Sequence, residues 1–238
     1  MKFKELIKKL NTSKKPLLAV LIDPDKFNSE LIHIANKSKA SCFLVGGSEL
    51  KNGDVTKTIL AIKKISKIPV ILFPGNESQL SKSADGLLLL SLLSGRNPDY
   101  LIGKHITAAP IIKKLKLDYL STAYILIDGG VLSATQKVTK TLPLNPNNKE
   151  LIINTALAAE QLGFKAIYLE AGSGAKQNIA APLIKKIKKE ITLPLIVGGG
   201  IDSVKKVQLI INSGANMIVI GNALEKNVFL LNEISKCF

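Results

Sequence analysis

The chain has 238 residues, of which 46% are hydrophobic and 21% are charged, a composition typical of a globular protein with a substantial core. Lysine and arginine number 33 against 18 acidic residues, which gives a formal net charge of +15, and Arg96 is the only arginine. No nucleic-acid-binding motif or aromatic platform accompanies the lysines, so we expect no nucleic-acid partner. The charge fits attraction to anionic substrates or to an anionic membrane surface.

No apolar run reaches the length that a membrane span requires, and residues 1–10 have the pattern of an amphipathic helix rather than of a secretion signal. The two cysteines, Cys42 in an expected strand and Cys237 in the last residues, provide no disulfide framework. These features favour a reduced, cytoplasmic compartment with at most peripheral membrane contact.

Short apolar runs alternate with helical patterns along the whole chain. Each run is continuously apolar rather than alternating, which indicates strands that are buried on both faces, as in a parallel sheet. The expected strands are residues 17–22, 42–45, 70–72, 86–90, 121–127, 166–170, 195–197 and 217–220. The expected helices between them are residues 29–39, 55–66, 98–115, 147–162, 176–189, 204–213 and 225–236.

Eight strands with connecting helices predict an α/β protein in which residues 1–238 form a single (β/α)8 TIM barrel rather than an open doubly wound sheet. One unit departs from this pattern. Only residues 76–84 separate Gly75 from Asp85, too few for an ordinary helix and its loops. We therefore expect the third helix to be short or missing, which would open the ring of helices there.

Glycine-rich segments follow three consecutive strands. Residues 168–175 have the sequence Tyr-Leu-Glu-Ala-Gly-Ser-Gly-Ala, so Glu170 lies at a strand tip beside a loop of small residues. Glycines at 198–200 and the pair Gly221 and Asn222 end the next two strands. Glycines let backbone N–H groups approach an anion closely, and phosphate sites of barrel enzymes lie at these strand ends. This pattern predicts an enzyme that acts on a phosphorylated small molecule.

Two earlier strand ends carry oxygen side chains. Asp23 ends the first strand and faces the predicted barrel mouth, where a carboxylate can bind Mg²⁺ if substrate phosphates supply other ligands. Taken alone, the Asp-Pro-Asp sequence favours a turn that Asp23 and Asp25 form with Pro24. Ser48 ends the second strand in Val-Gly-Gly-Ser, where it is either a second hydroxyl ligand or a helix cap.

Several further residues allow more than one interpretation. Asp128 at the end of the fifth strand is either loop structure or part of the site lining, and His33 and His105 are expected to be packing or surface residues. Apolar residues cluster beside the irregular third unit, namely the leucines within 87–93 and the residues at 101–102 and 111–112. They form either ordinary barrel core or an apolar surface that binds a long hydrocarbon.

The motifs together resemble the geranylgeranylglyceryl phosphate synthase family, which includes bacterial relatives that make heptaprenylglyceryl phosphate. Each motif is weak alone, whereas their order and spacing are specific and span nearly the whole chain. Residues 94–102 are also similar to the larger archaeal-type group of that family. The motifs are Leu-Ile-Asp-Pro-Asp-Lys at 21–26, Val-Gly-Gly-Ser at 45–48, Tyr-Leu-Glu-Ala-Gly-Ser-Gly at 168–174, Val-Gly-Gly-Gly-Ile at 197–201 and Ile-Gly-Asn at 220–222.

The resemblance implies a prenyltransferase of ether-lipid synthesis that joins sn-glycerol 1-phosphate to geranylgeranyl diphosphate and releases diphosphate. Asp23 and Ser48 match the family's Mg²⁺ positions, and Glu170, with Tyr168 beside it, matches the catalytic position. A homo-oligomer, either a dimer or a hexamer, is implied as well, and Tyr100 is a candidate for packing or assembly. The residues that match the glycerol-phosphate site are Tyr168, Leu169, Glu170, Ala171, Gly172, Ser173, Gly174, Gly199, Gly200, Gly221 and Asn222.

Other functions remain open at this point. The same barrel could use another prenyl length or a phosphoglycerate-type acceptor. A sugar-phosphate isomerase or aldolase would explain the glycines but not Asp23, and no lysine lies clearly on a strand tip for Schiff-base chemistry. A non-enzymatic protein that binds nucleic acid or a membrane surface would explain only the charge.

Overall fold

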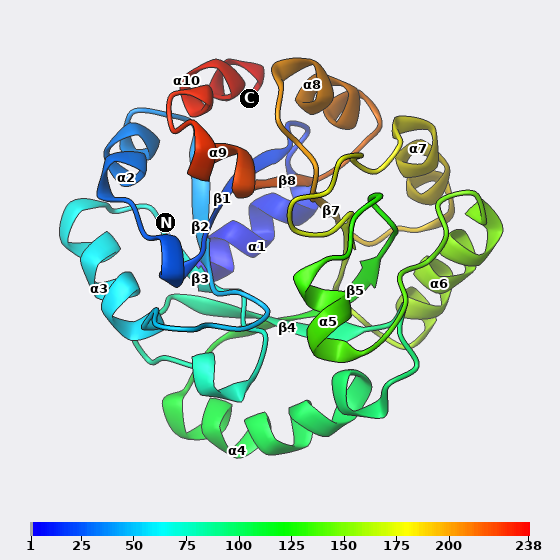
Figure 1. The fold of residues 1–238 in the computed structure, drawn as a ribbon, viewed down its shortest axis with the longest axis horizontal. Coiled ribbons are helices and arrows are strands. Elements are labelled where there is room, and N and C mark those ends of the chain that lie inside the picture. Colours follow the sequence, from blue (N-terminus) through cyan, green and yellow to red (C-terminus); the bar gives the residue numbers. More distant parts are fainter. Residues whose placement is uncertain (1) are drawn as a thin grey trace.

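Eight parallel strands close into a barrel in the order in which they occur in the chain, as Figure 1 shows. The computed structural model describes residues 2–238. The strands are β1 (Leu17–Ile22), β2 (Ala40–Val45), β3 (Val70–Leu72), β4 (Gly86–Leu92), β5 (Tyr119–Leu126), β6 (Ala166–Glu170), β7 (Leu195–Gly198) and β8 (Met217–Ile220). The last strand, β8, pairs in parallel with β1, where Leu17 lies opposite Met217. The predicted α/β class and the closed eight-stranded barrel are confirmed.

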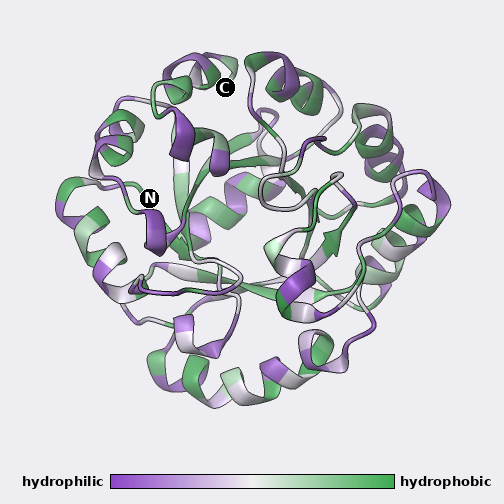
Figure 2. Ribbon diagram, in the orientation of Figure 1, coloured by the Kyte–Doolittle hydropathy of each residue, from purple (hydrophilic) through white to green (hydrophobic). Residues whose placement is uncertain are grey.

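Helices surround the barrel (Figure 1), and Figure 2 shows the mixed hydrophobic and hydrophilic colouring expected of amphipathic helices around an apolar sheet. Within residues 2–238, no helix combines the length and the apolarity needed to cross a membrane. The helices are α1 (Phe3–Thr12), α2 (Ser29–Asn36), α3 (Val55–Ile65), α4 (Lys104–Leu115), α5 (Ala134–Thr139), α6 (Lys149–Gln161), α7 (Ala181–Glu190), α8 (Val204–Asn212), α9 (Asn222–Lys226) and α10 (Leu230–Ile234). The shorter turns are η1 (Pro24–Lys26), η2 (Glu77–Gln79), η3 (Asp99–Gly103) and η4 (Ser235–Cys237).

Some helices differ from those predicted. The helix expected at 176–189 begins only at Ala181, because Lys176 and Gln177 instead donate their backbone N–H groups to the Gly129 carbonyl at 3.0 and 3.2 Å. The segment 225–236 divides into α9, α10 and η4. Periodicity did not predict α5, since six residues are too short for a helical pattern, although Ser133 begins it with a capping box.

The third unit lacks a full helix, as predicted. Between β3 and β4 the chain forms only the single turn η2, which ends at the buried Gln79. The Gln79 side chain donates to the Gly47 carbonyl at 2.8 Å and accepts from the Gly47 N–H at 3.2 Å. This pair of hydrogen bonds attaches the short turn to the loop after β2.

Strand residues alternate between the barrel interior and the helical ring. On β1, Leu18 and Val20 pack with the helices, whereas Ala19 belongs to the interior cluster. At the end of the interior where the strands finish, the Tyr168 ring lies 5.3 Å from the rings of both Phe73 and Tyr124, measured between centroids. This aromatic layer forms the floor of the barrel mouth.

Helix α1 closes the opposite end of the barrel, where the strands begin, and is visible through the ring in Figure 1. Phe3, Leu6 and Leu10 on one face of α1 are buried in the same cluster as the interior strand residues. The Phe3 ring lies so close to Gly86 that a side chain there would overlap it. Within residues 2–238, α1 therefore closes the interior at the end where the strands begin.

The packing of α1 predicts the effect of removing its aromatic anchor. Phe3→Ala should lower the free energy of unfolding by about 3 kcal/mol, because the buried ring leaves a cavity that the barrel cannot fill. Urea denaturation measures this loss, with the exposed neighbour Lys4→Ala as the matched control. Equal stability of the two variants would contradict the role assigned to α1.

Candidate active site

A cleft with two connected parts lies at the carboxyl ends of the strands. The larger part has a volume of about 350 Å³ and lies over the barrel mouth. The smaller part, about 120 Å³, lies between β4, η2 and α4. The two parts share lining residues, so they form one continuous space: Gly47, Ser48, Phe73, Tyr124, Thr135 and Val138.

Glu170, the last residue of β6, is the buried carboxylate of the larger part. Its Oε1 accepts a hydrogen bond from the Gly172 N–H at 2.7 Å. Burial raises the pKa of Glu170 to about 7, although the Gly172 hydrogen bond offsets part of this effect. A carboxylate with such a pKa is suited to accept a proton near neutral pH.

Glycines at the end of β7 make room for this carboxylate. A side chain at Gly198 would lie within 2.8 Å of Glu170 Oε2 and would overlap the Tyr168 hydroxyl, and one at Gly199 would overlap Glu170 Oε1. Gly198 was not among the predicted site residues, although the sequence has three consecutive glycines here.

The Tyr168 hydroxyl is completely buried and has no hydrogen-bond partner within the described chain. It lies beside the Glu170 carboxylate without meeting hydrogen-bond geometry, and burial raises its pKa well above the usual value of tyrosine. A buried hydroxyl without a partner carries a desolvation cost that a ligand oxygen would relieve.

The loops after β6, β7 and β8 line a hollow next to Glu170. Gly199 and Gly200 have φ values of 81° and 67°, which glycine adopts without strain. Asn222 Oδ1 accepts hydrogen bonds from Ser173 Oγ at 3.0 Å and from the Gly174 N–H at 3.1 Å. The loops after β6, β7 and β8 therefore meet at one place.

Most of the predicted glycerol-phosphate residues line the cleft, and three do not. Leu169 packs towards the helices, Ala171 is buried behind the loop, and Gly172 contributes only its N–H to Glu170. The residues that line the cleft are Tyr168, Glu170, Ser173, Gly174, Gly199, Gly200, Gly221 and Asn222.

The two predicted metal ligands, Asp23 and Ser48, also line the larger part of the cleft. Asp23 Oδ1 accepts the Asp25 N–H at 3.0 Å, so this carboxylate both forms the turn and faces the cleft. Burial raises the pKa of Asp23, an effect that the Asp25 N–H and Lys26 oppose. Ser48 Oγ lies 3.2 Å from Thr135 Oγ1. Within residues 2–238, no three His, Cys, Asp or Glu side chains form a metal-binding group.

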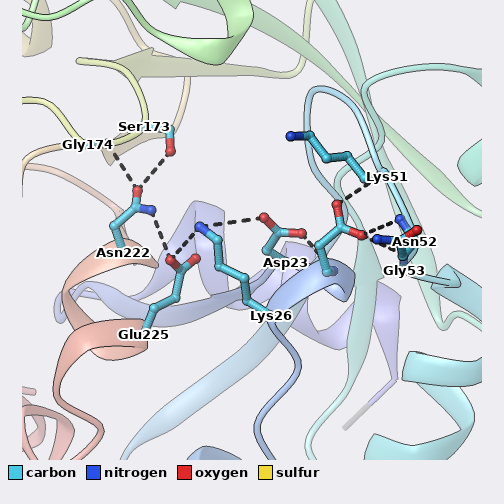
Figure 3. Close-up of polar contacts among 10 residues, drawn as sticks. Asp23, Lys26, Lys51, Asn52, Gly53, Ser173, Gly174, Asn222 and Glu225 are labelled. Carbon is cyan, nitrogen blue, oxygen red and sulfur yellow. Dashed lines mark hydrogen bonds and ion pairs between the residues drawn. The ribbon is translucent and has the colours of Figure 1, made fainter.

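Figure 3 shows polar contacts that join the loops around the mouth. Asp25 accepts the backbone N–H groups of Lys51 and Asn52 at 2.8 Å each, which holds the loop after β2. Lys26 Nζ lies 2.8 Å from Glu225 Oε2, and Asn222 Nδ2 donates to the same oxygen at 3.1 Å. Hydrogen bonding to Glu225 raises the pKa of Lys26.

The smaller part of the cleft is mainly apolar. Its walls come from β4, the short η2 segment and α4, and Tyr100 closes one side while its hydroxyl donates to the Val138 carbonyl at 3.2 Å. His105 lies 2.7 Å from Ser91 Oγ, and burial lowers the pKa of the imidazole. The apolar lining residues are Leu80, Leu87, Leu88, Leu89, Leu90, Leu92, Ala108 and Ile112.

Some predictions about single residues are resolved by these contacts. Asp128 Oδ1 accepts the Gly130 N–H at 2.8 Å, and the residue does not line the cleft, so it belongs to loop structure. Sequence reasoning did not identify Thr135, Glu225 or the Lys26 amine. Thr135 lies on the short α5, and Lys26 and Glu225 are 199 positions apart, so no local pattern connects them.

Comparison with known proteins shows the family of the chain. The model of the PcrB family matches residues 11–237. The geranylgeranylglyceryl phosphate synthase of Flavobacterium johnsoniae is 47% identical over 215 residues, which cover 89% of this chain and 88% of that protein. The synthase of Saccharolobus islandicus is 41% identical over 230 residues, 94% of this chain and 89% of that protein.

A solved structure has the same architecture. The crystal structure of (S)-3-O-geranylgeranylglyceryl phosphate synthase from Thermoplasma acidophilum, in complex with substrate sn-glycerol-1-phosphate, superimposes with a TM-score of 0.91. The two sequences are 28% identical, and the alignment covers 100% of this chain and 98% of the other. With the family match across residues 11–237, these findings establish that the chain belongs to the PcrB family, whose relatives include the geranylgeranylglyceryl phosphate synthases.

Proposed function

We propose that the chain is a geranylgeranylglyceryl phosphate synthase, which forms an ether bond between sn-glycerol 1-phosphate and geranylgeranyl diphosphate and releases diphosphate. The observation that carries this proposal is the single cleft in which the buried Glu170 carboxylate lies between an anion-sized hollow and an apolar groove. One end of this cleft fits a phosphate and the other fits a hydrocarbon.

The glycerol phosphate would bind in the hollow beside Glu170. The backbone at Gly199 and Gly200, together with Gly174 and Asn222, surrounds a volume suited to a phosphate. The unpartnered Tyr168 hydroxyl is available to a glycerol oxygen. Fixing the phosphate at these loops orients a glycerol hydroxyl towards Glu170, which lowers the entropic part of the barrier.

Glu170 then acts as the general base. As the glycerol oxygen bonds to the first carbon of the prenyl chain, Glu170 Oε2 accepts the hydroxyl proton, and the bond between that carbon and the diphosphate oxygen breaks. The diphosphate leaves with the electron pair. The pKa of about 7 keeps the carboxylate basic enough to take the proton while ionised near neutral pH.

The residues Asp23 and Ser48 fit a Mg²⁺ ion. Their oxygen atoms are the ligand type that Mg²⁺ prefers, and one carboxylate with a hydroxyl leaves positions for diphosphate oxygens and water. When bound, Mg²⁺ would offset the charge that develops on the leaving diphosphate. Asp23 is held in place for this role by the Asp25 N–H.

The prenyl tail would occupy the apolar groove between β4 and α4, which continues directly from the mouth at Phe73 and Tyr124. The proposal also includes a homo-oligomer, either a dimer or a hexamer, which the resemblance to the synthase family implies. Light scattering of the purified protein measures its mass in solution.

The test of the proposed function is a transferase assay with radiolabelled sn-glycerol 1-phosphate, Mg²⁺ and separate prenyl diphosphates of increasing length. The 3-phosphate enantiomer and a phosphoglycerate serve as controls. Label should enter the organic phase only with the 1-phosphate, most efficiently with the geranylgeranyl donor. Product with a different donor or acceptor would select one of the alternatives, and no product with any donor would overturn the synthase proposal.

Glu170→Gln should lower turnover by about 100-fold or more, because the amide cannot accept the hydroxyl proton. Binding of sn-glycerol 1-phosphate should change little, since the phosphate contacts come from other residues of the hollow. Steady-state kinetics and calorimetry measure the two effects separately. Turnover equal to that of the unmodified chain would remove Glu170 from the role of base.

The raised pKa of Glu170 predicts two pH effects. The value of kcat/KM should rise with pH and level off above about pH 7, where the free carboxylate is ionised. The folded pKa lies above the unfolded one, so protonated Glu170 favours folding below about pH 4.5, and this contribution is lost as pH rises to 7. Urea denaturation from pH 5 to 8 measures this effect. The free energy of unfolding should fall more steeply with rising pH for the unmodified chain than for Glu170→Gln.

Asp23→Asn should raise the Mg²⁺ concentration that gives half-maximal turnover by about tenfold, because an amide is a weaker ligand than a carboxylate. A titration of turnover against Mg²⁺ at a fixed prenyl diphosphate concentration measures this half-maximal Mg²⁺ concentration. An unchanged titration curve would place the metal elsewhere.

A further inference from the structure

An ion pair joins the two halves of the site at its rim (Figure 3). Lys26 lies on η1, which follows Asp23, and Glu225 lies on α9, which begins at Asn222. Their Nζ and Oε2 atoms are 2.8 Å apart, whereas Lys26 Nζ is 4.0 Å from Asp23 Oδ2. Lys26 therefore has two carboxylates within reach and pairs closely with only one.

Glu225 places a negative charge beside the hollow in which the phosphate is proposed to bind. It lines the same cleft as Gly199, Gly200 and Asn222, and its side chain is only 21% exposed. A carboxylate beside a phosphate site repels the ligand unless a cation neutralises it. Lys26 supplies this cation from the other half of the site.

Glu225 also orients the amide of Asn222. Glu225 Oε2 accepts from Asn222 Nδ2, which leaves Asn222 Oδ1 to accept from Ser173 and Gly174. A neutral glutamine at position 225 can keep this acceptor role, so charge and hydrogen bond are separable by substitution.

We propose that Lys26 and Glu225 are a pair of positioning residues in which each keeps the other's charge away from a neighbouring binding site. Lys26 neutralises Glu225 beside the phosphate hollow. Glu225 holds Lys26 away from Asp23, which leaves that carboxylate free for a cation. This inference rests on the proposed function, because it assigns the hollow to a phosphate and Asp23 to Mg²⁺.

The first test is calorimetric titration of sn-glycerol 1-phosphate into metal-free protein. Lys26→Met should weaken binding about fivefold, because it leaves Glu225 unneutralised in a partly exposed site. Glu225→Gln should stay within about twofold of the unmodified chain. The double variant should also return to within about twofold, since removing the carboxylate removes the repulsion.

The second test measures how the pair affects Mg²⁺ binding at Asp23. Glu225→Gln should raise the Mg²⁺ concentration for half-maximal turnover about fivefold, because the released Lys26 turns to Asp23. Lys26→Met should not raise it. The acceptor KM should increase in Lys26→Met alone, while kcat changes less than KM.

Matched controls keep these results interpretable. Lys57→Met removes an exposed lysine of α3 that does not line the cleft and should leave both measurements unchanged. Lys26→Arg keeps the charge and should bind like the unmodified chain. Circular dichroism checks that each variant is folded.

The outcomes distinguish the two proposals. In one outcome the unmodified chain binds sn-glycerol 1-phosphate while Lys26→Met and the double variant bind equally weakly. In that case the pair has only a structural role, and this inference fails while the proposed function stands. The inference also fails if Lys26→Met binds normally. If the unmodified chain does not bind sn-glycerol 1-phosphate, the proposed function fails with it.

Discussion

The arrangement of the site depends on keeping one carboxylate buried. Among the described residues, Glu170 has no ion-pair partner and accepts one backbone N–H, from Gly172, so burial dominates its ionisation. The protein accommodates it by omitting side chains at Gly198 and Gly199, where any Cβ would contact the carboxylate. Gly199 takes part in both features, since it lines the hollow and also leaves room for the carboxylate.

Charged side chains connect the loops around the rest of the mouth. Asp25 holds the loop after β2 through three backbone N–H groups, and Lys26 and Glu225 connect η1 with α9. These contacts cross the seam between β1 and β8, where the chain closes on itself. These contacts therefore join loops that are far apart in the sequence into one rim around the cleft.

The sequence predicted the fold closely because continuous apolar runs identify buried parallel strands. The sequence also placed Asp23 and Glu170 at the mouth, because each directly ends an apolar run, and both line the cleft. Leu169 belongs to the matching motif yet does not line the cleft, because a strand turns alternate residues away. Ala171 and Gly172 follow the end of β6, where Ala171 is buried and Gly172 donates its N–H to Glu170. Lys26 with Glu225, and Thr135 on the short α5, could not be predicted, because their proximity arises only from tertiary closure.

The single turn η2 determines where a long ligand can leave the molecule. Because α1 seals the lower end of the barrel, a hydrocarbon tail cannot run down the axis, and the space left by the missing helix directs it sideways through the wall. An amphiphile in this cleft would lie with its head on the axis and its tail at a right angle to it. The lipid product and the diphosphate would then have separate exits, one through the side and one through the mouth.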